Sequence, residues 1–292
     1  MSEGLRVGCF GLGAMGEPMA GHLASKGLLT GVYNRSAERA AAFSAQTGVA
    51  AYGEPAALAR VCNVLILCVS ADTDVVSLFA QLEPGLQPGS VLIDSSTVSS
   101  ATAQQLAERC AQIGVDFLDA PLTGGVEGAR NARLSVMVGG AAEVLARVRP
   151  ALEAFAARIT LMGPVGSGQA TKAVNQVMVS GIAQAVCEAL AFAEALGLPQ
   201  SELLSVLTGG AAQSWFLEKR GATMLNDQFA GGFKLQLLLK DLRIVEGMLQ
   251  QVGIRSSAVQ QSLLDYAALT EAGCGEQEIS ALIKRKRRKP AA

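Results

Sequence analysis

A short apolar run that leads directly into three spaced glycines constrains this chain more than any other feature. The run Leu5–Phe10 is followed at once by Gly11, Leu12, Gly13, Ala14, Met15 and Gly16, and a helix-like stretch comes next. This spacing is typical of a dinucleotide site: the first glycine permits a tight turn, the second lets the backbone approach a pyrophosphate, and the third lets the helix pack on the strand. The helix N-terminus adds N–H groups and a partial positive charge for the phosphates. We therefore expect all six residues to contact a dinucleotide, and the alternative is a glycine-rich turn without a ligand.

Short apolar runs alternate with alanine-rich, helix-like segments through the first half of the chain. The expected strands are Leu5–Phe10, Thr30–Asn34, Asn63–Val69, Val91–Asp94, Phe117–Asp119, Leu134–Val138 and Arg158–Leu161, and the expected helices include Ala37–Gln46 and Ser100–Ile113. Nearly continuous apolar strands separated by helices predict a parallel sheet covered on both faces, with right-handed crossovers.

The pattern changes after Gly163, and no convincing strand follows it. A long helix is expected over about residues 169–196, ended by Gly197 and Pro199. Shorter helices are expected at Ser201–Leu207, with Ser201 as the cap, and at Ser214–Leu225, Leu235–Val252 and Ser256–Ala272. We predict an α/β Rossmann-type domain over residues 1–163 and an all-α domain over residues 164–292, linked by the long helix.

Composition narrows the classes of protein to consider. The net charge is −1 and 17% of residues are charged, so the overall field favours neither nucleic acid nor a membrane surface. No uncharged apolar run reaches the roughly 18 residues of a membrane span, and the N-terminus does not resemble a signal peptide. The six cysteines form neither a C-x-x-C pair nor a disulfide framework, which predicts reduced thiols and a soluble, cytoplasmic protein.

Two further expectations concern the surface of the chain. The basic run from Lys284 to Lys289 is interpreted as a frayed, solvated end, and the alternative is an anion-binding or targeting tail. The long helix is apolar on several faces, and a small domain cannot easily cover such a helix. We therefore expect a homodimer or homotetramer built on the helical domain.

The end of the second expected strand indicates which dinucleotide is bound. NAD-selective sites place an acidic residue about 20 residues after the first glycine, where it binds the ribose 2′-hydroxyl. This chain instead has Asn34, Arg35 and Ser36 there, and the planar guanidinium of Arg35 suits a 2′-phosphate. We predict that these three residues contact the cofactor and that NADP is preferred over NAD. The alternative is an arginine that faces solvent at a helix start.

Elimination leaves few groups that could supply a proton during hydride transfer to a carbonyl. The only histidine, His22, follows the glycine turn and should have a structural or cofactor-adjacent role. No Cys/His spacing suggests a catalytic zinc site, and no tyrosine is followed four residues later by a lysine. Lys172 lies near the start of the long helix and shares a face with Asn175 and Gln176. A desolvated lysine has a lowered pKa and can act as a general acid. From spacing alone the alternative, a snorkelling surface lysine on an otherwise apolar helix, is favoured over catalysis.

The chain resembles the β-hydroxyacid dehydrogenases, a family that includes 3-hydroxyisobutyrate dehydrogenase, tartronate semialdehyde reductase and the glyoxylate/succinic semialdehyde reductases. The resemblance runs from about Arg6 to Ile283. Four motifs carry it in order: Gly11 to Ala20, Asp119-Ala120-Pro121-Leu122-Thr123-Gly124-Gly125, Gly166-x-Gly168-x-x-x-Lys172-x-x-Asn175-Gln176, and the segment from Gly232-Phe233 to Lys240-Asp241. It implies a fold like that of 6-phosphogluconate dehydrogenase, with the substrate between the two domains.

The resemblance also implies roles for individual residues. Lys172 would be the general acid/base, and Thr123, Gly124, Gly125 and Asn175 would bind a small carboxylated substrate. Val69, Ser70, Thr97 and Lys240 would contact the cofactor, although Lys240 and Asp241 could instead form an interior ion pair. Three positions depart from the usual pattern: Thr123 replaces a serine, His22 an asparagine and Gln176 a second asparagine.

The implied activity is NAD(P)-dependent interconversion of a small 3-hydroxy acid and its semialdehyde or keto acid. Two alternatives remain. An imine reductase shares the expected architecture, but such enzymes generally lack the Lys-x-x-Asn pair that Lys172 and Asn175 form. A non-catalytic dinucleotide-binding scaffold would have lost the lysine.

Overall fold

The computed structural model describes residues 4–287 and divides into two compact units. The first unit ends at Lys172 and the second begins at Ala173. The boundary between these compact units lies within the long helix, nine residues after the predicted domain boundary at residue 163.

The first unit is built on one nine-stranded sheet. Its strands are β1 (Val7–Phe10), β2 (Leu29–Tyr33), β3 (Ala50–Ala51), β4 (Val64–Leu67), β5 (Val91–Asp94), β6 (Asp116–Asp119), β7 (Leu122–Thr123), β8 (Leu134–Gly139) and β9 (Ala156–Gly163). They are ordered β3-β2-β1-β4-β5-β6-β8-β7, and β9 pairs with β8. The strands from β3 to β6 in this order are all parallel, as the apolar runs predict.

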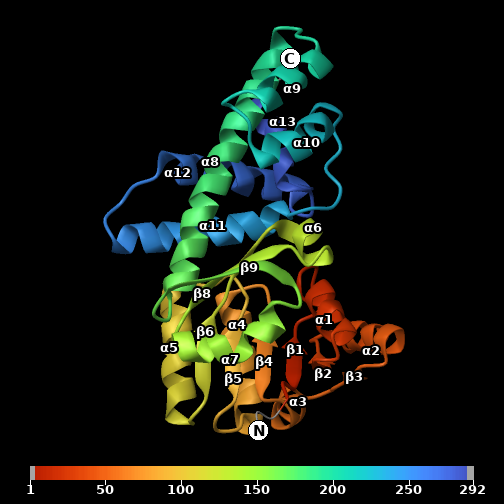
Figure 1. Cartoon of the computed structure of the whole chain (residues 1–292). Helices are drawn as coiled ribbons and strands as arrows, with labels where there is room; N and C mark the ends of the chain where they lie inside the picture. Colours follow the sequence, from red (N-terminus) through yellow and green to blue (C-terminus); the bar gives the residue numbers. More distant parts are fainter. Residues whose placement is uncertain (1–3, 288–292) are drawn as a thin grey trace. The chain divides into compact units, whose positions relative to one another are not determined.

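Helices cover both faces of this sheet (Figure 1). They are α1 (Gly16–Ser25), α2 (Ala37–Thr47), α3 (Pro55–Val61), α4 (Asp72–Leu82), the 3₁₀ turn η1 (Glu83–Gly85), α5 (Ser100–Gln112), α6 (Gly125–Arg130) and α7 (Ala142–Leu152). One hydrophobic core contains Leu23 of α1, Phe43 of α2 and Val148 of α7, and a second contains Leu58 of α3 and Phe79 of α4. The doubly covered sheet confirms the predicted Rossmann-type architecture.

The sheet is parallel over most of its width, and its last strands depart from the predicted parallel arrangement. Strand β8 runs antiparallel to both β6 and β7, and β9 is parallel to β8. Strands β3 and β7 were not predicted, because two residues are too few to show an alternating or continuous apolar pattern. Strand β7 is nevertheless important, because it carries Thr123, which pairs with Ser135 of β8.

The second unit is helical. It contains most of α8 (Ser167–Ala195), followed by α9 (Gln200–Gly209), α10 (Trp215–Leu225), α11 (Leu235–Gln251), α12 (Ser257–Leu269), the π turn η2 (Thr270–Cys274), the 3₁₀ turn η3 (Ile279–Leu282) and α13 (Ile283–Lys286). The five longer helices lie where the sequence predicts them. The expected cap at Ser201 is wrong, because α9 begins one residue earlier and Pro199 occupies the N-cap position. Proline suits a helix start, since it has no N–H to leave unpaired.

Helix α8 is long and apolar enough to cross a membrane by length and composition alone. Its side chains Ala183, Cys187 and Leu190 are nevertheless fully buried in the hydrophobic core of the second unit. A helix that is apolar on several faces is also what the core of a helical domain requires. The length of α8 is therefore weak evidence for a membrane span.

The basic segment near the C-terminus is ion-paired where the structure describes it. Lys286 binds Asp265 at 2.8 Å and Glu188 at 3.0 Å, and Arg287 binds both carboxylate oxygens of Glu194 at 2.7 and 2.8 Å. Burial alone would raise the pKa of Asp265, but hydrogen bonds from Lys286 and two glutamines lower it overall. The predicted frayed, solvated end is therefore wrong for Lys286 and Arg287, and Arg288 and Lys289 lie outside the described residues.

Candidate active site

The predicted cofactor residues of the first unit meet at one edge of the sheet. They follow the carboxyl ends of β1, β2, β4 and β5, and parallel neighbouring strands bring these ends together. The strand order reverses direction between β1 and β4, since β2 and β3 lie on one side and β5 and β6 on the other. In open α/β sheets a ligand binds outside the strand ends at this switch point. The sheet topology therefore places the glycine turn where a dinucleotide is expected.

The three glycines of the turn have different surroundings. Gly11 has a φ of +103°, and a Cβ there would collide with the carbonyl oxygen of Cys68 at the end of β4. A Cβ on Gly16 would collide with the carbonyl oxygen of Gly11, so this glycine allows α1 to pack against β1. A Cβ on Gly13 would meet no atom within 4 Å. The chain thus needs Gly11 and Gly16 for its own packing, whereas Gly13 leaves open space beside the helix N-terminus.

That open space fits a pyrophosphate. The first turn of α1 follows immediately, and its N–H groups carry the partial positive charge of the helix N-terminus. The side chain of Asn34 accepts a hydrogen bond from Leu12 N at 2.9 Å, which fixes the turn against the end of β2. Ala14 and Met15 complete the turn, and Met15 is the N-cap residue of α1.

The residues after β2 have structural partners as well. Asn34 donates to the carbonyl oxygen of Ser36 at 3.0 Å, and Ser36 caps α2 by accepting from Arg39 N. The side chain of Arg35 is 88% exposed and pairs with Asp74 at 3.0 Å. An exposed ion pair of this kind contributes little to stability. Arg35 can therefore leave Asp74 for a phosphate at small cost.

The loops after β4 and β5 are joined to each other. The Oγ atom of Ser96 accepts a hydrogen bond from Val69 N at 3.0 Å, and Ser96 N donates to Asp94 at 2.9 Å. Ser70 is exposed and Thr97 is half-buried beside this connection. Burial raises the pKa of Asp94 to about 6, although its bonds to Ser96 oppose the rise. The structure thus brings Val69, Ser70 and Thr97 together near the carboxyl ends of β4 and β5.

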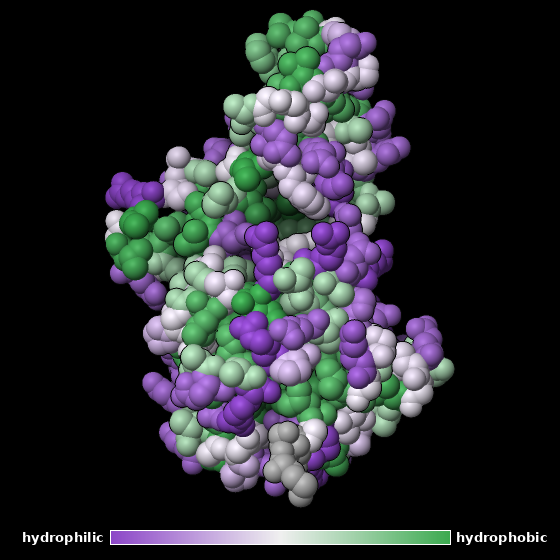
Figure 2. All heavy atoms as spheres, in the orientation of Figure 1, coloured by the Kyte–Doolittle hydropathy of each residue, from purple (hydrophilic) through white to green (hydrophobic). Residues whose placement is uncertain are grey.

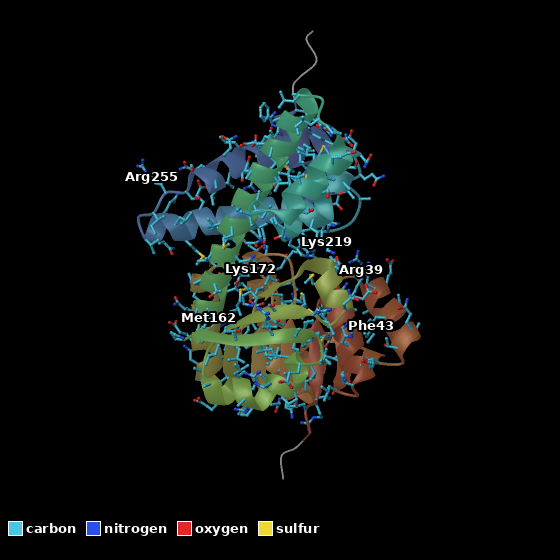
Figure 3. All side chains as sticks on the ribbon, turned by 45° about the horizontal axis from the view of Figure 1, so that its top comes forward. Arg39, Phe43, Met162, Lys172, Lys219 and Arg255 are labelled. Carbon is cyan, nitrogen blue, oxygen red and sulfur yellow. The ribbon has the colours of Figure 1, made fainter. Side chains whose placement is uncertain are left out.

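Lys172 lies next to the predicted substrate loop. Its side chain is 8% exposed, and Nζ donates to the carbonyl oxygen of Leu122 at 2.9 Å. Leu122 directly precedes Thr123, and Gly124 and Gly125 follow with φ values of +121° and +64°. Figure 3 marks Lys172 on the N-terminal part of α8. A surface lysine is therefore the wrong interpretation, and two motifs 50 residues apart in sequence meet at the Lys172 amine.

Sequence reasoning assigned no role to two residues that fix the start of α8. The carboxylate of Asp119 accepts hydrogen bonds from Gly166 N and Gln169 N, both at 2.8 Å. The Gln169 amide accepts from Val98 N at 3.2 Å and donates to Ser96 O at 2.8 Å. An acidic residue that caps a helix from a distant strand leaves no local signature in the sequence. The available signals were the position of Asp119 at the end of a predicted strand and its place at the start of the motif that ends at Gly125.

The remaining predicted residues form a polar network within the second unit. Asn175 donates to Gln176 at 2.8 Å, Gln176 donates to Asp241 at 2.7 Å, and Lys240 pairs with Asp241 at 2.8 Å. The interior ion pair considered for Lys240 and Asp241 is thus present. This network orients the Asn175 amide, and contact of Asn175 with substrate and of Lys240 with cofactor remain predictions.

His22 has a structural role, as expected. Its Nε2 lies 3.0 Å from the carbonyl oxygens of both Ala129 and Arg130 at the end of α6. Two carbonyl acceptors require Nε2 to carry the proton. His22 therefore ties α1 to α6 and does not act as the acid.

A doubly covered parallel sheet with this glycine turn defines the first unit as the nicotinamide-dinucleotide-binding domain of a dehydrogenase. Residues 6–163 match the family described as the NAD binding domain of 6-phosphogluconate dehydrogenase, and residues 166–285 match the family described as NAD-binding of NADP-dependent 3-hydroxyisobutyrate dehydrogenase. The chain belongs to the 3-hydroxyisobutyrate dehydrogenase family of NAD(P)-dependent oxidoreductases, so the predicted resemblance, enzyme class and cofactor are confirmed.

Individual relatives agree over most of their length. An uncharacterised oxidoreductase of Shewanella frigidimarina is 37% identical over 242 residues, which cover 82% of this chain and 83% of the relative. The 2-hydroxy-3-oxopropionate reductase of Escherichia coli is 33% identical over 288 residues, 96% of each chain. The structure of the 3-hydroxyisobutyrate dehydrogenase of Mycobacterium tuberculosis with L-serine superposes with a TM-score of 0.88 at 30% identity, covering 98% of this chain and 100% of that one.

Proposed function

We propose that this chain interconverts a small 3-hydroxy acid and its semialdehyde or keto acid, with Lys172 as general acid and base. The observation that carries the proposal is the 2.9 Å hydrogen bond from Lys172 Nζ to Leu122 O, which holds a buried ammonium beside Thr123. This bond places the amine beside the proposed carboxylate loop, where an ammonium can donate a proton to a substrate oxygen. Family membership supports the same reaction class.

In the reductive direction the substrate carbonyl receives one hydride and one proton. When bound, the reduced nicotinamide supplies the hydride that the carbonyl carbon receives. Lys172 gives a proton to the carbonyl oxygen as negative charge develops on it, and the resulting neutral amine regains a proton from solvent. Because the ammonium is buried, its attraction for the developing oxyanion is stronger than it would be in water. In the oxidative direction the same amine, starting neutral, accepts the hydroxyl proton.

The loop after β7 is proposed to bind the substrate carboxylate. Thr123 offers a hydroxyl, and Gly124 and Gly125 are in positive-φ conformations that only glycine adopts easily. Successive N–H groups in such a turn can converge on an anion. We place Asn175 at a substrate hydroxyl or carboxylate, because its amide is already oriented by Gln176.

NADP is proposed as the preferred cofactor. No acidic residue follows β2 to bind a ribose 2′-hydroxyl, whereas Arg35 presents an exposed guanidinium there. The family matched by residues 166–285 is described as NADP-dependent, which supports this preference. The proposed contacts of Asn34, Ser36, Val69, Ser70, Thr97 and Lys240 with the cofactor depend on the same site.

A panel of carbonyl substrates tests the reaction class. NADPH and NADH oxidation would be measured with glyoxylate, tartronate semialdehyde, succinic semialdehyde and methylmalonate semialdehyde. The methyl ester of each acid is the matched control, since it keeps the carbonyl and removes the negative charge. We expect turnover of at least one acid, at least tenfold slower turnover of its ester, and a lower KM for NADPH than for NADH. Turnover of a cyclic imine but of no carboxylated carbonyl would favour an imine reductase, and tight NADPH binding without any turnover would favour a scaffold.

The remaining proposals concern partners and location. Exposed apolar side chains lie at the end of α8 and in α9 and around the α11–α12 connection: Phe192, Leu196, Leu198, Val206, Val252 and Ile254. Figure 2 shows hydrophobic surface over these segments. Patches of this kind mark interaction surfaces, and we propose a second copy of the chain as the occupant, giving a homodimer or homotetramer. Light scattering on the purified protein tests this.

Six free cysteines support a cytoplasmic location, and we propose neither nucleic acid nor a membrane as partner.

A further inference from the structure

We propose that Gln169 is a positioning residue that couples the cofactor loop after β5 to the helix turn carrying Lys172. The proposal rests on the function proposed above, because it concerns the geometry of the same proton donor. Gln169 is 1% exposed and lies three residues before Lys172 on α8. It therefore occupies the turn of helix immediately next to the lysine.

Both ends of the Gln169 amide are committed to the loop that contains Thr97. The Oε1 atom accepts from Val98 N at 3.2 Å, and Nε2 donates to Ser96 O at 2.8 Å. These two backbone groups flank Thr97 on either side. A side-chain amide that bonds one donor and one acceptor of the same loop fixes both its distance and its orientation.

The backbone of Gln169 is held just as firmly. Its N–H donates to Asp119, and the same carboxylate accepts from Gly166 N, so the first turn of α8 is attached to the end of β6. A Cβ on Gly168 would collide with the carbonyl oxygen of Met137, which shows how closely the helix approaches the sheet. The first turn of α8 thus has one fixed position, and Gln169 ties the Thr97 loop to that position.

Loss of Gln169 would affect catalysis, because the reaction depends on how the Lys172 amine is placed relative to the nicotinamide end of the site. Proton and hydride transfer to one carbonyl need the amine and the nicotinamide end of the site in a fixed relation, and a displacement of about 1 Å can cost about 100-fold in rate. The pyrophosphate and adenosine side of the cofactor is proposed to lie on other loops, chiefly the turn from Gly11 to Gly16. Loss of Gln169 is therefore expected to lower kcat far more than cofactor affinity.

The test compares two isosteric substitutions on the same helix. Gln169→Met keeps the length of the side chain and removes both hydrogen bonds. Gln184→Met makes the same change four turns later, where the buried amide of Gln184 binds Ser262 and Asp265 inside the second unit. We expect Gln169→Met to lower kcat about 10- to 100-fold with the NADPH Kd changed less than threefold, and Gln184→Met to leave kcat within twofold.

A second variant covers the case in which Gln169→Met does not fold. Gln169→Glu is isosteric, accepts from Val98 N in either charge state, and regains a donor toward Ser96 O only when protonated. The ratio of its kcat to that of the wild type should rise as the pH falls. The ratio is needed because Asp94, Asp119 and Lys172 are the charged groups nearby and affect both proteins. A merely structural role for Gln169 would give a ratio that does not change with pH.

Several results would overturn the proposal. A folded Gln169→Met protein with kcat within threefold of the wild type would do so, as would equal losses of kcat and NADPH affinity. Lys172→Ala belongs in the same assay: if it keeps wild-type turnover, the proposed function itself fails, and no effect of Gln169 can then act through the lysine.

Discussion

Replacing Gly13 by alanine separates cofactor binding from folding. No atom lies within 4 Å of a Cβ built at Gly13, and its φ is outside the left-handed region, so the free protein can accept a methyl group. Alanine has less backbone freedom than glycine in the unfolded chain, so the substitution should stabilise the protein by about 0.4–1 kcal/mol. The methyl occupies the space proposed for the pyrophosphate. We expect the NADPH Kd to rise about 10- to 100-fold, which corresponds to roughly 1.4–2.8 kcal/mol.

Two other glycines supply the controls. Gly21 lies within α1, and a Cβ there also meets nothing within 4 Å, so Gly21→Ala should stabilise the helix and leave NADPH binding unchanged. Gly16→Ala should lower the Tm, because its Cβ collides with the carbonyl oxygen of Gly11. Thermal unfolding and NADPH fluorescence titration measure both effects. If Gly13→Ala bound NADPH within twofold of the wild type, no pyrophosphate could lie against this turn.

Three further substitutions probe electrostatics. Burial raises the pKa of Asp94 to about 6, so ionisation of its carboxyl group opposes folding. Between pH 4 and 7 the wild type should therefore lose up to about 3 kcal/mol of stability relative to Asp94→Asn. A stability difference between the two proteins that does not change with pH would contradict this. Arg35→Ala should raise the KM for NADPH about tenfold and leave the KM for NADH unchanged, because only NADPH carries the 2′-phosphate. The Tm should stay constant, because the ion pair of Arg35 with Asp74 is exposed. Equal effects on both cofactors would refute the 2′-phosphate role. Lys286→Met should lower the free energy of unfolding by about 1–3 kcal/mol at pH 7. The loss should be smaller in acid, because protonation of Asp265 as the pH falls through its lowered pKa removes the charge that Lys286 binds. A urea denaturation curve identical to that of the wild type would show that the ion pair does not stabilise the basic segment.

The sequence predicted the parts of the fold that depend on local pattern. The long apolar strands and the major helices lie where periodicity indicated, and β5 matches its predicted bounds. The parts that failed depend on tertiary contacts. Strands β3 and β7 are each two residues long, and the direction of β8 is set by its neighbours and not by its own residues. The ion pairs of Lys286 join residues far apart in the chain, which a charge run cannot reveal.

The candidate site shows the same division. Glycine spacing located the cofactor turn, and the resemblance placed Lys172 and Thr123 in one site. Neither indicated that the lysine amine binds the carbonyl oxygen of Leu122. The roles of Asp119 and Gln169 also appeared only in the structure, because their partners lie about 50 and 70 residues away in sequence.

The turnover of Lys172→Ala tests the central claim most directly. NADPH-dependent reduction of the best substrate would be compared with the wild type and with Lys26→Ala, which removes an exposed lysine at the end of α1. Loss of a general acid should lower kcat by about 10²- to 10⁴-fold, while NADPH affinity stays within threefold and Lys26→Ala behaves as the wild type. A Lys172→Ala protein that keeps kcat within tenfold of the wild type would show that another group supplies the proton.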